Sequence, residues 1–444
     1  MAHGGDRYRN NIQLDFSVNL NPLDTPECLI TAMQKGIREV GYYPDPEQEA
    51  AKKAAAGFYS EMSGVKIDPS WAVPGNGASE LISAVVHAVC LHEVLIPAPC
   101  FTGYLHACHS ERKEGSIDSP AGGDGVPLSF VGNDLPGNSL SEESIPKKQV
   151  SQKALSGRVV FYRTKEEKGF TPDDELGMMI GPKTELLILT NPGNPAGGLI
   201  DSAILRRILQ ITRERKIPVL LDECFMEFTG RTAAGRTTGM NAKTTAETIA
   251  GTTVGTAEKT TAITNEIEES GLALLSEFPN LMVLRAFTKI FSMPGLRLGI
   301  LFTADRGLQR KISAALPEWN LSCFAEAVLG AAAEEKKALW EYIRNTVKET
   351  KRLRGRMEKK LSELGTMVYP SDANFLLTKG LSEYREKLLS EGILVRSCGD
   401  MWPLTDDYIR LSVRPEPDQD VLFKALKKIM AEKERTTLWI NRLN

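Results

Sequence analysis

Short apolar runs alternate with helical patterns along most of this chain, and this rhythm limits the folds that it can adopt. A strand covered on both faces shows a continuous apolar run, so each run predicts a buried strand. The helical pattern at 203–216 lies between two such runs, an order typical of βαβ units. Ligands of such sheets bind beyond the carboxyl ends of the strands. We therefore predict an α/β fold with a mostly parallel sheet flanked by helices, with strands at 94–97, 159–162, 185–190, 218–221, 281–284 and 298–302.

Three regions are expected around this sheet. We predict an N-terminal arm that also joins a small domain (1–45), a large domain that holds the sheet (46–310), and a C-terminal small α+β domain with a short tail (311–444). Two stretches, 112–156 and 231–265, contain few large apolar side chains, so we predict that they are disordered insertions. A loop is predicted at 99–104, after the first strand of the large domain. A helical pattern at 325–364, either two helices or one bent helix, leads into the small domain. The expected elements of that domain are strands at 374–378, 393–396 and 408–413 and helices at 382–390 and 418–433.

The composition argues against several classes of partner. The 444 residues include 54 basic and 57 acidic side chains, a net charge of −3, so no positive excess points to nucleic acid or an anionic membrane surface. No apolar run approaches the length of a membrane span, and the first residues lack the apolar core of a secretory signal. None of the seven cysteines forms a Cys-x-x-Cys pair, so we predict reduced thiols in a cytoplasmic protein and no metal site.

Charged residues and glycines gather where the predicted strands end. Lys289 follows the strand at 281–284, and burial there would favour the neutral amine that attacks a carbonyl. Arg297 offers a planar fork of hydrogen-bond donors that suits a phosphate. The glycine-rich turn at 75–77 precedes a helix predicted at 79–92, and the free N–H groups at the start of a helix also suit a phosphate. Taken singly, these residues also fit a solvated lysine, an ion-paired arginine and an ordinary helix cap. Together they supply what pyridoxal phosphate requires, a Schiff-base lysine beside a phosphate site.

This combination resembles the fold-type I pyridoxal phosphate enzymes of the aspartate aminotransferase superfamily, over nearly the whole chain outside the two insertions. The resemblance implies that the cofactor is pyridoxal 5′-phosphate, that Lys289 forms the Schiff base and that Asp222 pairs with the ring nitrogen. Tyr43 would reach the phosphate of a second subunit, which implies a homodimer. Ala286 replaces the usual Ser or Thr, and the lost phosphate hydrogen bond would cost about 1–2 kcal/mol if nothing replaces it. The resemblance also implies that Phe101 stacks on the ring and that Asn194 donates to its 3-oxygen. The phosphate would be held by Gly77, Ala78, Ser79 and Arg297, and Phe225 and Thr288 would also bind the cofactor.

Further motifs narrow the resemblance to one branch of that superfamily. His-Gly-Gly-Asp at 3–6, Gly-Tyr-Tyr-Pro-Asp-Pro at 41–46 and Ile-Leu-Val-Arg-Ser-Cys at 393–398 look like motifs of the threonine-phosphate decarboxylases of cobamide synthesis. Their close relatives are the histidinol-phosphate aminotransferases. Phe225 in place of a tyrosine, the run Arg396-Ser397-Cys398, and Arg414 in place of a small residue favour the decarboxylases. The resemblance further implies that a small phosphorylated amino acid is bound through its phosphate and carboxylate by His3, Asn19, Arg396 and Arg410.

This branch implies decarboxylation of O-phospho-L-threonine to (R)-1-amino-2-propanol O-phosphate, the linker of the cobamide nucleotide loop. Decarboxylation of O-phospho-L-serine and transamination of histidinol phosphate are alternatives that use the same catalytic residues. One methyl group gives only about 1–3 kcal/mol of discrimination, so the sequence leaves threonine and serine open. A non-catalytic binding module of the same fold is a further alternative, and the presence of Lys289, Asp222, Asn194 and Arg297 counts against it.

Overall fold

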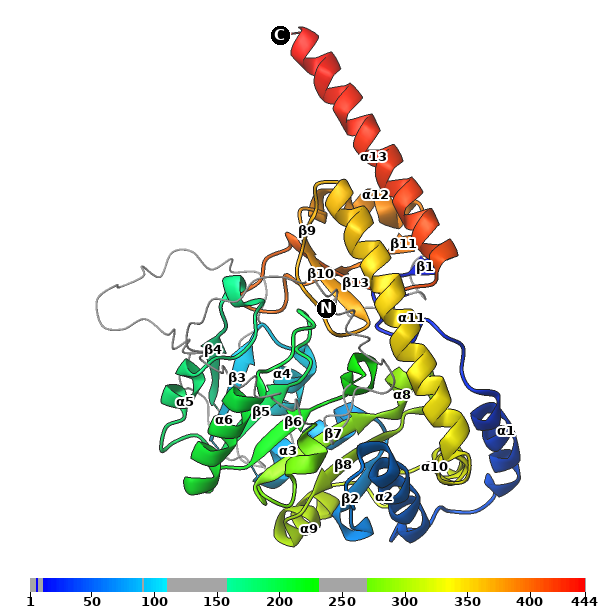
Figure 1. Ribbon diagram of the computed structural model, residues 1–444, viewed down its shortest axis with the longest axis vertical. Helices are drawn as coiled ribbons and strands as arrows, with labels where there is room; N and C mark the ends of the chain where they lie inside the picture. Colours follow the sequence, from blue (N-terminus) through cyan, green and yellow to red (C-terminus); the bar gives the residue numbers. More distant parts are fainter. Residues whose placement is uncertain (1–4, 7–10, 90–91, 110–157, 231–269, 444) are drawn as a thin grey trace, which may run out of the picture.

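The computed structural model describes residues 5–6, 11–89, 92–109, 158–230 and 270–443 (Figure 1). The two predicted insertions, 112–156 and 231–265, lie outside the described residues. The rest of the chain forms a large sheet with its helices and a smaller sheet beside it, and the long helix α11 (Lys336–Glu363) runs from one to the other (Figure 1). No helix in the described ranges is both long enough and apolar enough to cross a membrane.

The large sheet has seven strands and confirms the predicted mostly parallel arrangement. Six strands run in one direction, and β8 is antiparallel to both of its neighbours, β2 and β7. The strand β2 was not among the predicted strands. In spatial order the strands are β2 (Ala72–Gly75), β8 (Gly299–Thr303), β7 (Leu281–Ala286), β6 (Val219–Asp222), β5 (Leu186–Thr190), β3 (Glu93–Ala98) and β4 (Arg158–Arg163).

Helices cover this sheet because each presents one apolar face to it. In α6 (Ser202–Glu214), Leu205, Ile208 and Leu209 are buried at helical spacing. Asp201 caps this helix by accepting hydrogen bonds from the N–H groups of Ala203 and Ile204 at 2.9 and 3.0 Å. The sheet itself contributes strands that are buried on both faces, so the main core runs through its centre. The other helices of this part are α2 (Glu49–Ser63), α3 (Ala78–Val89), α4 (Thr102–His109), α5 (Glu175–Met179), α7 (Gly271–Leu274), α8 (Phe287–Ile290) and α9 (Arg306–Ala314).

The smaller sheet is antiparallel and has its own apolar core. Its spatial order is β12 (Arg396–Ser397), β13 (Tyr408–Ser412), β10 (Phe375–Lys379) and β9 (Met367–Val368). The N-terminal arm reaches this part of the molecule, because β1 (Leu14–Asp15) pairs in parallel with β11 (Ile393–Leu394). The arm then leads to α1 (Glu27–Gly36), and α12 (Arg385–Ser390) and α13 (Glu416–Leu443) complete the smaller part.

The helical pattern at 325–364 forms two helices, α10 (Cys323–Glu334) and α11, which is one of the two predicted arrangements. Two other local predictions differ from the structure. The segment predicted as a loop after β3 turns into α4 at Thr102. The last helix continues to Leu443 instead of ending at 433, because no glycine or proline follows Pro417 to stop it. Its far end projects away from the rest of the molecule (Figure 1).

Candidate active site

Five strands bring the predicted site residues to one edge of the large sheet. Thr190 is the register partner of Asp222, so the ends of β5 and β6 lie side by side. Gly299, at the start of β8, pairs with Gly75 and with Ala286, at the ends of β2 and β7. The antiparallel direction of β8 therefore places the residues before it beside the residues that follow β2 and β7. These neighbouring segments carry Arg297, the turn 75–77 and Lys289.

Asp222 lies at the centre of this edge as a buried carboxylate that is fixed from two sides. Its Oδ2 accepts a hydrogen bond from the hydroxyl of Tyr104 at 2.7 Å, and its Oδ1 accepts one from the N–H of Cys224 at 3.0 Å. The hydroxyl of Tyr104 also lies 2.8 Å from that of Thr190. Burial and the nearby Asp222 raise the pKa of Tyr104, so this phenol stays a donor. Asp222 is thus held as a hydrogen-bond acceptor that can pair with a cationic ring nitrogen.

Lys289 carries an amine whose proton is easily lost. Burial and the charge of Arg410 lower the pKa of this amine from 10.5 to about 8, and the charge of Arg297 acts in the same direction. The amine lies 5.9 Å from the centre of the Phe225 ring, which itself packs edge-on against Phe375 at 5.1 Å. About a tenth of Lys289 is therefore a neutral nucleophile at pH 7, far more than for an amine with the usual pKa.

The turn before α3 forms a cradle with Arg297. Gly77 has a φ of +89°, and a Cβ on it would lie 2.7 Å from a terminal nitrogen of Arg297. A Cβ on Gly299 would lie 2.9 Å from the backbone nitrogen of Ala78. Only glycine allows these close approaches. The first N–H groups of α3, at Ala78 and Ser79, thus lie close to a guanidinium, an arrangement that suits a phosphate.

Two buried arginines stand opposite each other on the smaller sheet. Arg396 and Arg410 are register partners on β12 and β13. Arg396 forms an ion pair with Asp400 at 2.7 Å and donates to the carbonyl of Ser397 at 2.8 Å. Arg410 donates to Asn194 Oδ1 at 2.6 Å and to the carbonyl of Ser17 at 2.8 Å. Its Nε has no hydrogen-bond partner among the described residues.

Arg410 is therefore a buried cation surrounded by neutral partners. Burial and the nearby Arg396 lower the pKa of its guanidinium to about 10, and the group nevertheless stays charged at neutral pH. A buried charge without an opposite charge is costly, and an anion beside Arg410 would remove that cost. The hydrogen bond from Arg410 to Asn194 joins this pair of arginines to the carboxyl edge of the large sheet.

The remaining predicted residues differ in how close the structure places them to this region. Thr288 is buried directly before Lys289, and Phe101 packs edge-on against Tyr104 with ring centres 5.6 Å apart. Asn19 is buried, and its Oδ1 has no hydrogen-bond partner in the described part of the chain. Tyr43 is 81% exposed and stacks on Trp319 at 4.8 Å, apart from the other site residues. His3 lies outside the described residues.

Three contributors to the site did not emerge from the sequence. Tyr104 was assigned to a loop without a role, although it is the side-chain donor to Asp222. Asp400 neutralises Arg396 from four residues away, and Ser17 binds Arg410 through a backbone carbonyl. The four-residue spacing of Arg396 and Asp400 was the one available signal, since no side-chain pattern marks a backbone acceptor. Arg414, one of the residues that favoured the decarboxylases, pairs with Asp418 at 2.8 Å at the start of α13.

Comparisons with known proteins identify the family. Residues 11–114 and 149–429 match the family described as aminotransferase class I and II. This chain belongs to that family. A histidinol-phosphate aminotransferase structure from Clostridium acetobutylicum has the same fold, with a TM-score of 0.70, 24% identity, and coverage of 94% of this chain and 99% of that one. Within the described residues, no cluster of His, Cys, Asp and Glu could hold a metal ion.

The relatives of this chain have different names, two of which refer to threonine-phosphate decarboxylation or adenosylcobalamin biosynthesis and one to transamination. A putative threonine-phosphate decarboxylase from Caldanaerobacter subterraneus is 27% identical over 98% of this chain and 97% of its own length. The adenosylcobalamin biosynthesis bifunctional protein CobDQ from Leptospira interrogans is 27% identical over 92% of this chain, which spans only 38% of that protein. A histidinol-phosphate aminotransferase from Thermococcus gammatolerans is 25% identical over 94% of this chain and 92% of its own length.

Pyridoxal 5′-phosphate is the cofactor of this family member, and the site fits it. The cradle formed by Gly77 and Arg297 leaves no room for a side chain where a phosphate would bind. Asp222 is a buried acceptor for a ring nitrogen, and Lys289 is an amine of lowered pKa for an aldehyde. We expect Asn194 and Phe101 to complete the ring site.

Proposed function

We propose that this chain decarboxylates O-phospho-L-threonine to (R)-1-amino-2-propanol O-phosphate. The observation that carries the proposal is the pair of buried arginines, Arg396 and Arg410, placed opposite each other beside Asn194. A phosphorylated amino acid has two anionic groups, its carboxylate and its phosphate, and two guanidinium groups can hold both. The relatives named for threonine-phosphate decarboxylation support the same substrate class.

Phe225 adds support for the decarboxylase branch. Its ring lies beside the Lys289 amine and packs against Phe375, so it places no hydroxyl near the cofactor ring. We infer that Asn194, which already binds Arg410, links the ring to the substrate anion site. Of the other two features that pointed to this branch, Arg396 forms an ion pair with Asp400 and Arg414 forms one with Asp418.

When bound, pyridoxal phosphate supplies an aldehyde for the substrate amine and a ring that accepts electrons from a bond broken at Cα. Asp222 stabilises the proton on the ring nitrogen, and Tyr104 and the N–H of Cys224 keep the carboxylate in place for this role. Arg396 and Arg410 would hold the two anionic groups of the substrate and so orient the bond at Cα that is to be broken. The carboxylate leaves as CO2, and Lys289 returns a proton to Cα.

Transamination of histidinol phosphate is the second candidate, favoured by the relatives with that name. The same Lys289 and Asp222 serve both reactions, since only the bond that is turned perpendicular to the ring differs. Histidinol phosphate has a phosphate but no carboxylate, so only one of the two arginines would bind an anionic group of this substrate. O-phospho-L-serine is a further candidate substrate, because one methyl group is worth only about 1–3 kcal/mol.

We also propose that the chain works as a homodimer in the cytoplasm. Tyr42 and Tyr43 are 75% and 81% exposed, and the neighbouring Ile37 and Val40 are 59% and 67% exposed. Such a cluster of exposed apolar side chains suits a protein interface. A second copy docked on it would place Tyr43 near the partner's cofactor phosphate. Sedimentation of the wild type against Tyr43→Asp tests this, and a monomeric wild type would contradict it. The six cysteines in the described ranges are free thiols, in keeping with a reducing compartment.

The cofactor spectrum during turnover tests the reaction type. A decarboxylase returns its cofactor to the aldehyde form after each cycle, whereas a transaminase without an oxo acid leaves it as the amine. We expect the Schiff-base absorption of the loaded protein to persist while O-phospho-L-threonine is consumed. Bleaching in proportion to the amount of enzyme, with one oxo acid released per site, would contradict the proposal. The control is Lys289→Ala, because this variant lacks the amine that forms a Schiff base with the cofactor.

A further inference from the structure

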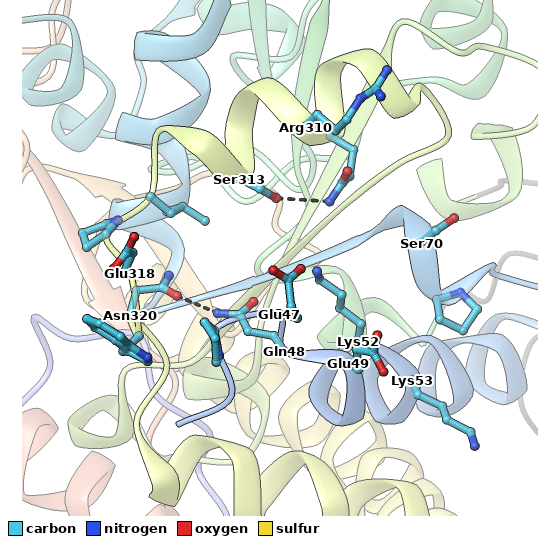
Figure 2. Close-up of a pocket in the computed structure, with 16 residues that line it drawn as sticks. Glu47, Gln48, Glu49, Lys52, Lys53, Ser70, Arg310, Ser313, Glu318 and Asn320 are labelled. Atoms are coloured by element: carbon cyan, nitrogen blue, oxygen red, sulfur yellow. Dashed lines mark hydrogen bonds between the residues drawn. The ribbon is translucent and has the colours of Figure 1, made fainter. Parts of the chain in front are cut away.

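A chain of hydrogen bonds runs from a surface groove to the turn that precedes α3. The groove has a volume of about 730 Å³ and is lined by residues of α2, α9 and the segment between α9 and α10. On its wall the Gln48 amide donates to Asn320 Oδ1 at 2.6 Å (Figure 2). The Asn320 amide donates to Glu80 Oε2 at 2.8 Å, and the same carboxylate oxygen accepts from the N–H of Asn76 at 2.6 Å. Asn76 lies in the turn directly before Gly77.

The backbone around this chain of hydrogen bonds is strained. Gln48 is buried and has a φ of +53°, and Trp319, next to Asn320, also has a φ of +53°. Arg297, on the other side of the turn, has a φ of +57°. Each such conformation costs about 1–3 kcal/mol for a residue with a side chain and persists only where the surroundings enforce it. Three of the six non-glycine residues with positive φ in the described ranges therefore belong to this chain of hydrogen bonds, lie next to one of its members in sequence, or contact its turn.

Glu80 is the member of the chain whose position matters most for an anion. It lies in the first turn of α3, where a carboxylate can bind the free N–H groups of the helix start and repel a phosphate. Here the carboxylate is directed backwards, to Asn76 and Asn320. The N–H groups of Ala78 and Ser79 lie in the first turn of α3, where the helix offers them no carbonyl acceptor. They therefore stay available for a phosphate.

We propose that Glu80, Asn320 and Gln48 are positioning residues for the phosphate of the cofactor. Asn320 and Gln48 hold the Glu80 carboxylate behind the turn, and Glu80 in turn fixes Asn76 so that Gly77 keeps its close approach to Arg297. None of the three touches the phosphate. The inference concerns the cofactor alone and does not depend on which substrate the enzyme uses.

The test compares a cofactor that has the phosphate with one that lacks it. Cofactor-free protein is titrated with pyridoxal 5′-phosphate and with pyridoxal, and binding is followed by the Schiff-base absorption. Each alanine variant removes two hydrogen bonds of the chain. Their loss is expected to weaken the binding of pyridoxal phosphate about tenfold in Glu80→Ala and about fivefold in Asn320→Ala, with the binding of pyridoxal unchanged. Because both changes break one chain, the double variant is expected to lose less than the product of the two.

Two further variants keep the result interpretable. Gln48→Gly removes the outermost bond while it relieves a left-handed backbone, so it is expected to fold at least as stably and to weaken pyridoxal phosphate about twofold to threefold. Glu318→Ala removes another carboxylate of the groove that is no part of the chain of hydrogen bonds, and its affinities are expected to match the wild type. Equal weakening of both cofactors, or an undiminished affinity of Glu80→Ala for pyridoxal phosphate, would overturn the proposal.

Discussion

Beneath the active site, Arg285 is a fully buried cation shared by two buried carboxylates. It contacts Glu223 at 2.7 Å and Glu227 at 3.1 Å, and it also donates to Ser270. Glu223 directly follows Asp222, the last residue of β6. Arg285 lies on the neighbouring strand β7, and Lys289 follows that strand in α8. Substitution of Arg285 by methionine would leave both carboxylates buried without a counter-charge. We therefore expect Arg285→Met to lower the free energy of unfolding.

The expected loss for Arg285→Met is about 3–5 kcal/mol of unfolding free energy, the range for breaking a buried ion pair by removing one partner. An exposed pair with the same 2.7 Å separation, Arg206 and Glu277, provides the control, and Arg206→Met is expected to lose under about 1 kcal/mol. Replacing the whole cluster, with Glu223→Leu and Glu227→Met added to Arg285→Met, is expected to recover much of the loss, because no buried charge remains.

The loss also has a predicted pH dependence. Burial raises the pKa of Glu223 and of Glu227, and Arg285 opposes this rise. In Arg285→Met both pKa values increase further, so the folded protein holds protons that the unfolded chain has released above its own pKa. Stability of the variant therefore falls as pH rises, and the loss is expected to be larger at pH 8 than at pH 5.

Urea unfolding of the cofactor-free proteins, followed by circular dichroism at both pH values, measures these losses without a contribution from bound cofactor. A loss below about 1 kcal/mol at pH 8 would refute the assigned role of the cluster, as would a loss that is greater at pH 5 than at pH 8.

Three further predictions concern the active site. The rate at which pyridoxal reacts with cofactor-free protein is expected to rise with pH around a midpoint near 8, the pKa of the Lys289 amine. Arg410→Met removes a nearby positive charge and should shift that midpoint upwards. A midpoint near 10.5 in the wild type would contradict this prediction. Arg410→Lys cannot bind Asn194 and Ser17 as a fork and is expected to raise KM for O-phospho-L-threonine about tenfold to a hundredfold, and an unchanged KM would exclude this arginine from substrate binding. Tyr104→Phe removes the side-chain donor to Asp222 and is expected to lower kcat about tenfold, whereas Thr190→Val should have a smaller effect; the reverse order in steady-state assays would contradict the assignment.

The central residues of the site could be predicted because local sequence determines their positions. Asp222 and Lys289 each follow a buried strand directly, so a correct strand assignment places both at the carboxyl edge of the sheet. Gly77 and the start of α3 are local features in the same sense. A resemblance that covers nearly the whole chain then supplied the roles of these residues, which remain predictions until they are tested by substitution.

Other features depend on contacts between distant segments, which no local pattern encodes. The antiparallel direction of β8 brings Arg297 to the phosphate cradle, and it follows from pairing with β2 and β7. The bond from Arg410 to the carbonyl of Ser17 joins residues 393 positions apart. The ion pair of Arg414 with Asp418 was likewise not predicted, and the support that Arg414 gives to the decarboxylase branch stays a prediction. Sequence patterns therefore predicted the cofactor site better than the groups that select the substrate.

Release of CO2 from O-phospho-L-threonine by the cofactor-loaded protein, with no oxo acid present, tests the central claim most directly. We expect many turnovers per site and one 1-amino-2-propanol O-phosphate for each CO2 released. The same assay with O-phospho-L-serine gives a second rate, and the ratio of the two rates identifies the preferred substrate. The account also predicts that Arg396→Ala impairs phosphorylated substrates far more than L-threonine. Absence of CO2, together with formation of glutamate from histidinol phosphate and 2-oxoglutarate, would contradict the account and assign the chain to transamination.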